Sequence, residues 1–205
     1  MNEYQELIDT FNEKGFDANF FEDSGAARDY VMELIAGAGT VGIGGSQTLK
    51  DTGIFDAIAQ SGKTLYASAL ERQKENPDMA DMMQKATFAD CYVTSSNAIT
   101  KEGDFINIDA TGNRVAPMFF GPKHTIIVCG INKITDNAHK AIARIKQEAV
   151  PKNAQRLGLA TPCAVKGKCE NCNSPQRICR IVVRIQYPTR VTNIHLVLIN
   201  EELGY

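Results

Sequence analysis

Apolar positions recur at helical spacing at the start of the chain. Residues 3–14 carry one such stripe and Gly15 ends it, which predicts a first helix. A second amphipathic helix is expected to begin at Ser24, whose hydroxyl can cap it. The apolar stripes of the two helices are Tyr4, Leu7, Ile8 and Phe11, and then Ala27, Tyr30, Val31 and Leu34. Residues 1–38 are therefore expected to form an N-terminal helical segment.

Beyond residue 38, short and continuously apolar runs alternate with helical patterns. The runs predict strands at 40–43, 64–68, 91–95, 105–108, 124–130, 181–185 and 194–199. The helices between them are expected to pass through Phe55 and Ile58, to open at Pro77, and to begin at Asp136 and reach Pro151, which interrupts or ends the last one. Strands that are apolar throughout are typical of a parallel sheet covered on both faces. The pattern predicts an α/β fold, a mostly parallel open sheet with flanking helices.

Composition narrows the class of protein. The 205 residues suit one domain, taken here as 1–205, and 43% hydrophobic with 22% charged residues can build a globular core. A net charge of −2 argues against nucleic-acid binding. The acidic opening MNEYQELIDTFNEKG is unlike a signal peptide, and no apolar run approaches the length of a membrane helix. A cytoplasmic protein without membrane association is expected.

The stretch VGIGGSQTLKD, residues 41–51, runs from a buried strand through glycines into a helix. Free backbone N–H groups at such a turn can hold a phosphate or carboxylate. Two glycines would let a ligand approach the backbone, and the polar side chains that follow would add hydrogen bonds. The candidate binding residues are Gly44, Gly45, Ser46, Gln47 and Thr48. A plain strand–helix turn, with Ser46 as an ordinary cap, is the alternative.

Polar residues also cluster where later strands end. In open α/β sheets that edge forms the ligand crevice. The candidate ligand-binding residues here are Ser96, Asn97, Gly112, Asn113, Arg114 and Lys133. Asp109 or Glu102 would transfer a proton, and Lys123 would stabilise developing negative charge. His124, His139 and His195 are expected to be ordinary surface or core histidines, with a position of His124 at the crevice as the alternative. The alternative makes these residues turn formers and solvated surface.

Four of the six cysteines follow the pattern C-x5-C-x2-C-x6-C within residues 162–180. They are Cys163, Cys169, Cys172 and Cys179. Four thiolates suit structural zinc or an iron–sulfur cluster, although the spacing is not that of ferredoxins. Disulfide or free-thiol redox chemistry, and inert cysteines, stay open as alternatives. Cys91 and Cys129 lie in apolar strands and are expected in the core.

Several stretches together resemble the LUD-domain family of lactate-utilisation proteins, also called DUF162. They are VGIGGSQTLKD, SSNAITKEGDFINIDATGNRVA, FGPKHTIIVCGINKI, PKNAQRLG and IHLVLINEELGY. The resemblance implies a NagB/RpiA/CoA-transferase-like fold with an added antiparallel portion, and a small anionic metabolite as ligand. It also implies an accessory role beside iron–sulfur oxidoreductase partners that oxidise lactate to pyruvate. A stand-alone phosphosugar isomerase or acyl-CoA transferase, a non-catalytic ligand sensor, and a homo-oligomer stay open.

Overall fold

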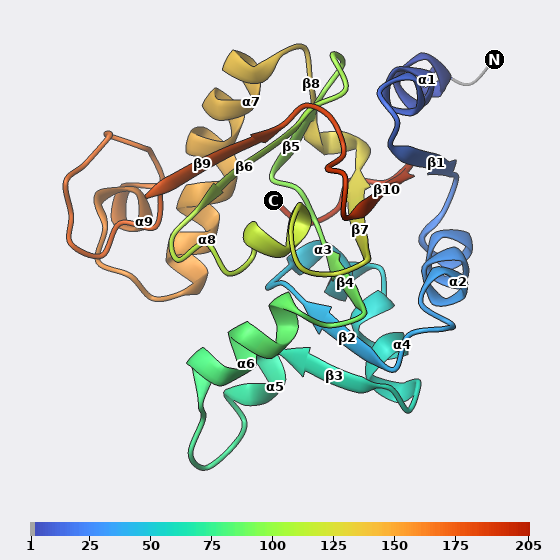
Figure 1. Cartoon of the computed structure of the whole chain (residues 1–205). Helices are drawn as coiled ribbons and strands as arrows, with labels where there is room; N and C mark the ends of the chain where they lie inside the picture. Colours follow the sequence, from blue (N-terminus) through green and yellow to red (C-terminus); the bar gives the residue numbers. More distant parts are fainter. Residues whose placement is uncertain (1–2) are drawn as a thin grey trace.

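The computed structural model describes residues 3–205 and arranges them as two sheets with helices on their outer faces (Figure 1). The helices are α1 (Gln5–Glu13), α2 (Ser24–Leu34), α3 (Gln47–Asp51), α4 (Ile54–Gln60), α5 (Ser68–Glu71), α6 (Met79–Thr87), α7 (Ala138–Arg144), α8 (Val150–Arg156) and α9 (Pro162–Lys166). Short 3₁₀ turns lie at Ala116–Met118 and Ile131–Lys133, and a π-helical turn lies at Ile145–Ala149. No helix within residues 3–205 is both long enough and apolar enough to span a membrane.

The larger sheet is parallel throughout. Within the described residues it contains β1 (Asp17–Phe21), β2 (Thr40–Ile43), β3 (Thr64–Ala67), β4 (Cys91–Thr94), β7 (His124–Gly130) and β10 (Asn193–Ile199), in the order β1-β10-β7-β4-β2-β3. The smaller sheet is mixed and contains β5 (Ala98–Thr100), β6 (Phe105–Asp109), β8 (Ile134–Thr135) and β9 (Ile181–Ile185), in the order β8-β5-β6-β9. Its β6 is antiparallel to both β5 and β9. The predicted α/β fold with a parallel sheet and an antiparallel portion is confirmed.

Three layers of apolar contact hold these elements together. Alternate residues of β7 point to opposite faces, so Ile126 and Val128 pack beneath α2 and α4 while Ile127 packs toward α1 and the smaller sheet. The far face of the smaller sheet packs on α7, α8 and α9 through residues such as Ile106 and Ala154. The smaller sheet is thus enclosed between the larger sheet and the C-terminal helices.

The chain leaves β2 and β4 in opposite directions. After β2 it enters α3 and α4, which pack on one face of the larger sheet, and after β4 it enters β5, which packs on the other face. These two strands are hydrogen-bonded neighbours, with Ile43 beside Val93. Such a divergence between adjacent parallel strands opens a crevice at their carboxyl ends.

Four local predictions need correction. Residues 17–21 form the edge strand β1, so the N-terminal segment is not purely helical. Asp23 rather than Ser24 caps α2, by accepting a hydrogen bond from the N–H of Ala26 at 2.9 Å. Gly53 adopts a left-handed conformation, with φ +70°, and divides the third helix into α3 and α4. The last long helix begins after Asn137, which caps α7 in place of Asp136.

Pro151 does not end the C-terminal helix. Residues 138–156 are helical throughout, but the π-helical turn of residues 145–149 interrupts the α-helix just before Val150 and Pro151. A proline inside an α-helix lacks an N–H and collides with the preceding turn. The wider π turn relieves that collision, and such turns often occur at functional sites. It also sets the face of α8 that meets the crevice.

His124 and His195 lie together at the amino edge of the larger sheet, away from the crevice. Their rings are joined by a hydrogen bond of 3.1 Å between His124 Nδ1 and His195 Nε2. His195 is buried, and its Nδ1 lies 2.8 Å from Asp17 Oδ2. The alternative that places His124 at the crevice is therefore wrong, because β7 begins at the opposite edge of the sheet.

We expect this pair to make stability depend on pH. Burial lowers the pKa of His195 below its usual 6.5, an effect that Asp17 opposes and His124 reinforces. Below pH 6.5 the unfolded chain therefore binds more protons than the folded one, and the free energy of unfolding falls as the pH falls toward the folded pKa. Urea denaturation at pH 7 and pH 5 should show a smaller loss in His195→Gln than in the exposed control His139→Gln. Equal losses in the two variants would contradict this prediction.

Candidate functional site

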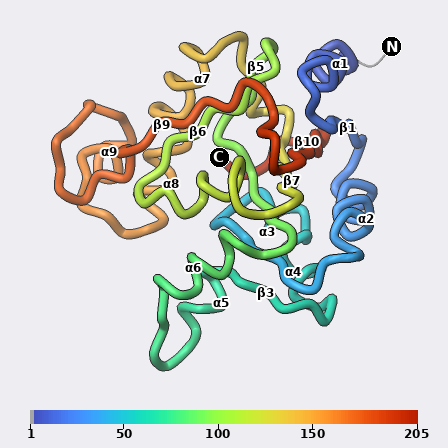
Figure 2. Tube along the Cα trace, in the orientation of Figure 1, coloured from blue at the N-terminus to red at the C-terminus, as the bar shows by residue number. Residues whose placement is uncertain are grey.

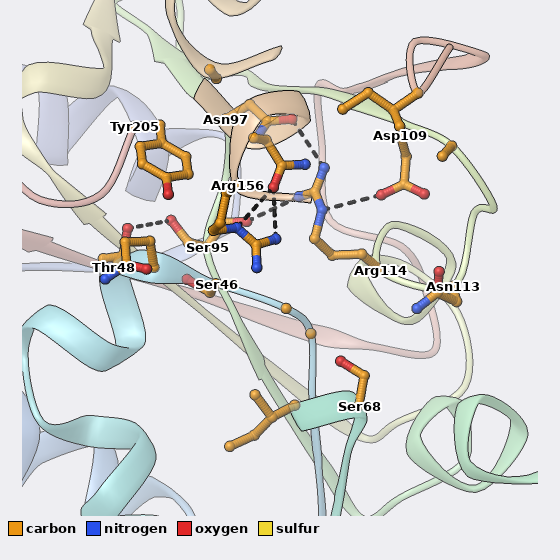
Figure 3. Close-up of a pocket in the computed structure, with 18 of the residues that line it drawn as sticks. Ser46, Thr48, Ser68, Ser95, Asn97, Asp109, Asn113, Arg114, Arg156 and Tyr205 are labelled. Atoms are coloured by element: carbon orange, nitrogen blue, oxygen red, sulfur yellow. Dashed lines mark hydrogen bonds and ion pairs between the residues drawn. The ribbon is translucent and has the colours of Figure 1, made fainter. Parts of the chain in front are cut away.

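A pocket of about 310 Å³ opens at the carboxyl ends of β2 and β4. The turn after β2 and the strand end of β4 form its base, the loop after β6 forms one wall, and α8 with residues 67–72 forms the others. Figure 3 shows Thr48, Ser95 and Tyr205 on one side of this space and Asp109 with Arg114 on the other. Residues far apart in the sequence therefore meet at one sheet edge.

The turn after β2 carries the predicted glycines and polar residues into the pocket. Ser46 caps α3, since its Oγ accepts a hydrogen bond from the N–H of Leu49 at 3.3 Å. A side chain at Gly44 would collide with Tyr92 Oη and Thr94 Oγ1, so packing requires that glycine. Since α3 has only five residues, its dipole is small. Charged side chains must supply most of the attraction for an anion.

Arg114 is the structural hub of the pocket wall. Its guanidinium makes an ion pair with Asp109 at 3.1 Å, and both side chains are largely buried. It also donates to four oxygens of the neighbouring strands: Ser95 O (3.2 Å), Asn107 Oδ1 (2.8 Å), Asn97 Oδ1 (2.9 Å) and Ile108 O (3.1 Å). Arg114 therefore ties the end of β4 to the end of β6 and shapes the wall between them.

Asp109 is engaged at both carboxylate oxygens. Its Oδ2 accepts from Arg114, and its Oδ1 accepts from the backbone N–H groups of Thr111 and Gly112 at 3.1 and 2.7 Å. Gly112 does not line the pocket, and its φ of +95° allows this turn. The geometry gives Asp109 the task of holding Arg114 and the loop in place. Its predicted part in proton transfer stays a prediction.

Lys133 is buried against two hydroxyl groups. Its Nζ lies 2.7 Å from Thr48 Oγ1 and 2.7 Å from Ser95 Oγ, and all three side chains line the pocket. Within residues 3–205 no carboxylate forms an ion pair with this ammonium group. The pKa of Lys133 is lowered to about 8, chiefly because the amine is buried; Arg144 and Arg114 also lower this pKa, while Cys129 and Asp51 oppose the shift. The amine therefore loses its proton at slightly alkaline pH rather than near the usual lysine value of 10.5.

The described lining of the pocket is strongly cationic. Its positively charged residues are Lys50, Arg72, Arg114, Lys133 and Arg156, and its one acidic side chain is that of Asp109. Arg156 donates to the amide oxygen of Asn153, at 2.7 and 3.2 Å, and has no acidic partner within residues 3–205. The side chains of Lys50 and Arg72 form no ion pair or hydrogen bond with the described residues. The positive charges of Lys50, Arg72 and Arg156 are therefore available to a ligand.

A sequence model of the LUD domain matches residues 4–199, which is nearly the whole chain. The chain belongs to the LUD domain family. A crystal structure of a DUF162 family protein from Deinococcus radiodurans aligns with a TM-score of 0.55 and 10% identity. The alignment covers 95% of this chain and 94% of the other, and it supports the fold. The comparison of this chain with curated proteins found no match.

The pocket of this LUD domain contains most of the predicted binding residues. Those that line it are Gly44, Gly45, Ser46, Gln47, Thr48, Ser96, Asn97, Asn113, Arg114 and Lys133, together with Asp109. Sequence analysis missed Arg72, Arg156 and Ser95. Arg72 follows shortly after a predicted strand, and Arg156 lies in the PKNAQRLG stretch that resembles the family. Both positions could have indicated a place at the pocket.

Two predicted catalytic residues lie elsewhere. Glu102 is in the turn between β5 and β6, where its carboxylate lies 3.5 Å from Arg184. Lys123 directly precedes β7, so it lies at the amino edge of the parallel sheet. Neither residue lines the pocket. Nearness to a strand in sequence is not sufficient, because only carboxyl ends of parallel strands face this crevice.

The cysteine-rich loop lies at the far side of the molecule from α1 (Figure 2). Cys163 is buried in α9, where its Sγ lies 3.3 Å from Thr161 Oγ1, while Cys169, Cys172 and Cys179 are half-buried. No three His, Cys, Asp or Glu side chains within residues 3–205 are grouped so as to hold a metal ion. The four sulfurs as placed do not fit a zinc or iron–sulfur centre, and that centre stays a prediction.

Proposed function

We propose that this LUD domain binds a small anionic metabolite in the strand-end pocket and takes part in organic-acid utilisation. The observation that supports this most directly is the excess of positive charge in the pocket lining. Lys50, Arg72 and Arg156 offer donors that no described acidic side chain neutralises. Guanidinium groups bind carboxylates and phosphates through two parallel hydrogen bonds, which suits a carboxylate or phosphate ligand.

The size of the pocket supports a small ligand. A volume of about 310 Å³ is at the lower end of the range for ligand sites. A hydroxy acid, a 2-oxo acid or a short sugar phosphate fits this space.

Calorimetric titration with lactate, pyruvate, inorganic phosphate and ribose 5-phosphate tests the proposal. We expect at least one of these anions to bind, and we expect Arg72→Gln to weaken that binding by about tenfold, or 1.4 kcal/mol, because one charged donor is lost. Arg190→Gln is the matched control, because Arg190 is exposed and lies outside the pocket. Failure of all four anions to bind, or an equal loss in both variants, would overturn the proposal.

The resemblance to lactate-utilisation proteins also supports an accessory role beside an iron–sulfur oxidoreductase. In that form of the proposal the LUD domain would bind the organic acid while the partner carries the electrons. Adding the LUD domain to such a purified lactate-oxidising partner should raise its lactate oxidation, and Arg72→Gln should reduce the gain. No change in rate on addition of the wild-type chain would argue against the accessory role.

A further inference from the structure

Ser95, Lys133 and Thr48 form a hydrogen-bonded cluster inside the pocket. Ser95 stands at the carboxyl end of β4, Lys133 in the turn after β7, and Thr48 in α3. Lys133 Nζ lies 2.7 Å from each hydroxyl oxygen, and the two hydroxyl oxygens are 3.3 Å apart. The proposed anion ligand does not account for an amine placed between two hydroxyl groups.

This arrangement has the parts of an activated nucleophile. A hydroxyl group within hydrogen-bond distance of a base, with the base oriented by a third group, is the arrangement by which serine enzymes work. Ser95 supplies the hydroxyl group, Lys133 the base and Thr48 the orienting group. The backbone oxygen of Ser95 also accepts from Arg114 at 3.2 Å, which fixes the end of the strand that carries the nucleophile.

We propose that Ser95 is a nucleophile, that Lys133 is its general base, and that the pocket thereby hydrolyses a carboxylic ester of a small anionic acid. This inference rests on the proposed function, because the anionic group of the substrate would bind to the free cationic side chains there. Arg72 and Arg156 line the same pocket as Ser95 and would hold that group. The acyl carbon would then lie near Ser95 Oγ.

The chemistry balances with water as the only co-reactant. Ser95 Oγ forms a bond to the acyl carbon, its proton passes to the neutral amine of Lys133, and the bond to the alcohol breaks as the alcohol takes that proton. Water then attacks the acyl-serine, gives a proton to Lys133, and releases the acid as Ser95 regains its proton. No oxidant, reductant or metal is consumed.

Burial supports Lys133 as the base. The groups that act on its amine are Cys129 from β7, Arg144 from α7, Arg114 and Asp51. Burial raises the pKa of Cys129, so that thiol is neutral near pH 7 and gives no compensating negative charge. With the pKa of Lys133 at about 8, a substantial share of the amine is neutral at slightly alkaline pH. General bases of this kind act best near their own pKa.

Mono-p-nitrophenyl succinate is a suitable probe, because it combines an activated ester with a carboxylate. We expect p-nitrophenolate release at a rate that rises with pH around 8, and a succinyl group on Ser95 identified by peptide mass spectrometry. Ser95→Ala should lower the rate by at least about a hundredfold, while Ser95→Cys should still be acylated. Ser61→Ala is the matched control, since Ser61 follows α4 and lies outside the pocket.

Separate outcomes distinguish the inference from the proposed function. Calorimetry with succinate on the Ser95→Ala variant shows whether the pocket is still folded and binds the anion. Retained binding without any acylation of the wild-type chain would overturn the role of Ser95 and leave the anion site intact. Acylation on Lys133 instead of Ser95 would also overturn it. Absence of binding by every anion tested would remove the proposed function and the inference together.

Discussion

Replacing Arg114 with methionine should lower the free energy of unfolding by about 3–5 kcal/mol. The substitution removes five hydrogen bonds and leaves the carboxylate of Asp109 without its cationic partner. Asp109 is only 9% exposed, so water can replace little of the lost positive charge. Breaking a buried ion pair from one side costs far more than the pair contributes on its own, because a buried charge remains.

Urea denaturation monitored by circular dichroism measures this loss. The double variant Arg114→Met/Asp109→Asn should recover part of it, because no unpaired charge then remains. Arg190→Met is the control for removal of an exposed arginine and should change stability by less than about 0.5 kcal/mol. A loss below about 1 kcal/mol in Arg114→Met would show that Arg114 is not the hub of the pocket wall.

The parallel sheet could be predicted from the sequence because its central strands are buried on both faces. β4 and β7 are apolar through most of their length, a pattern that is typical of strands in a parallel sheet covered on both faces. β1 was not predicted, because it is not buried on both faces. It lies at an edge, pairs with β10 alone among the described strands, and includes polar residues such as Asp17 and Asn19. Its pairing is set by tertiary contacts, which local sequence does not encode.

The site could be predicted only where it follows strand ends. Ser96 and Asn97 come directly after β4 and were identified, because the parallel fold fixes where that strand ends. Arg156 comes from α8, and its approach to the pocket depends on the π turn before Pro151. A π turn has no recognised sequence signature, so the sequence left open whether the helix ends at Pro151 or continues beyond it. Long-range packing, and not local pattern, brings Arg156 to the pocket.

Lys133 and Arg114 are both buried positive charges in the pocket, but their partners differ. Arg114 is compensated by the carboxylate of Asp109, and that pair stabilises the wall. Lys133 has two neutral hydroxyl partners instead, which satisfy its hydrogen bonds but leave its charge uncompensated. An uncompensated buried amine is poorly suited to a purely structural role. It is well suited to accept and return a proton.

Because the charge of buried Lys133 is uncompensated, we expect the free energy of unfolding to depend strongly on pH. Burial lowers the pKa of Lys133 from 10.5 to about 8. Between these two values the unfolded chain holds a proton that the folded chain has released, so this group makes the free energy of unfolding rise with pH. A difference of about 2.5 pKa units corresponds to a gain of about 3 kcal/mol from pH 8 to 10.5. Buried Tyr92 and Cys129 act in the opposite direction, because burial raises the pKa of each.

Comparison with Lys133→Met isolates the contribution of Lys133. Urea denaturation of the two proteins at intervals from pH 7.5 to 10.5 should give a difference in unfolding free energy that grows by about 3 kcal/mol in favour of the wild type. The exposed-lysine variant Lys140→Met, tested in parallel, should follow the wild type. Parallel curves for wild type and Lys133→Met would mean that the amine keeps its proton throughout this range. A lysine that stays charged to pH 10.5 could not act as the base for Ser95.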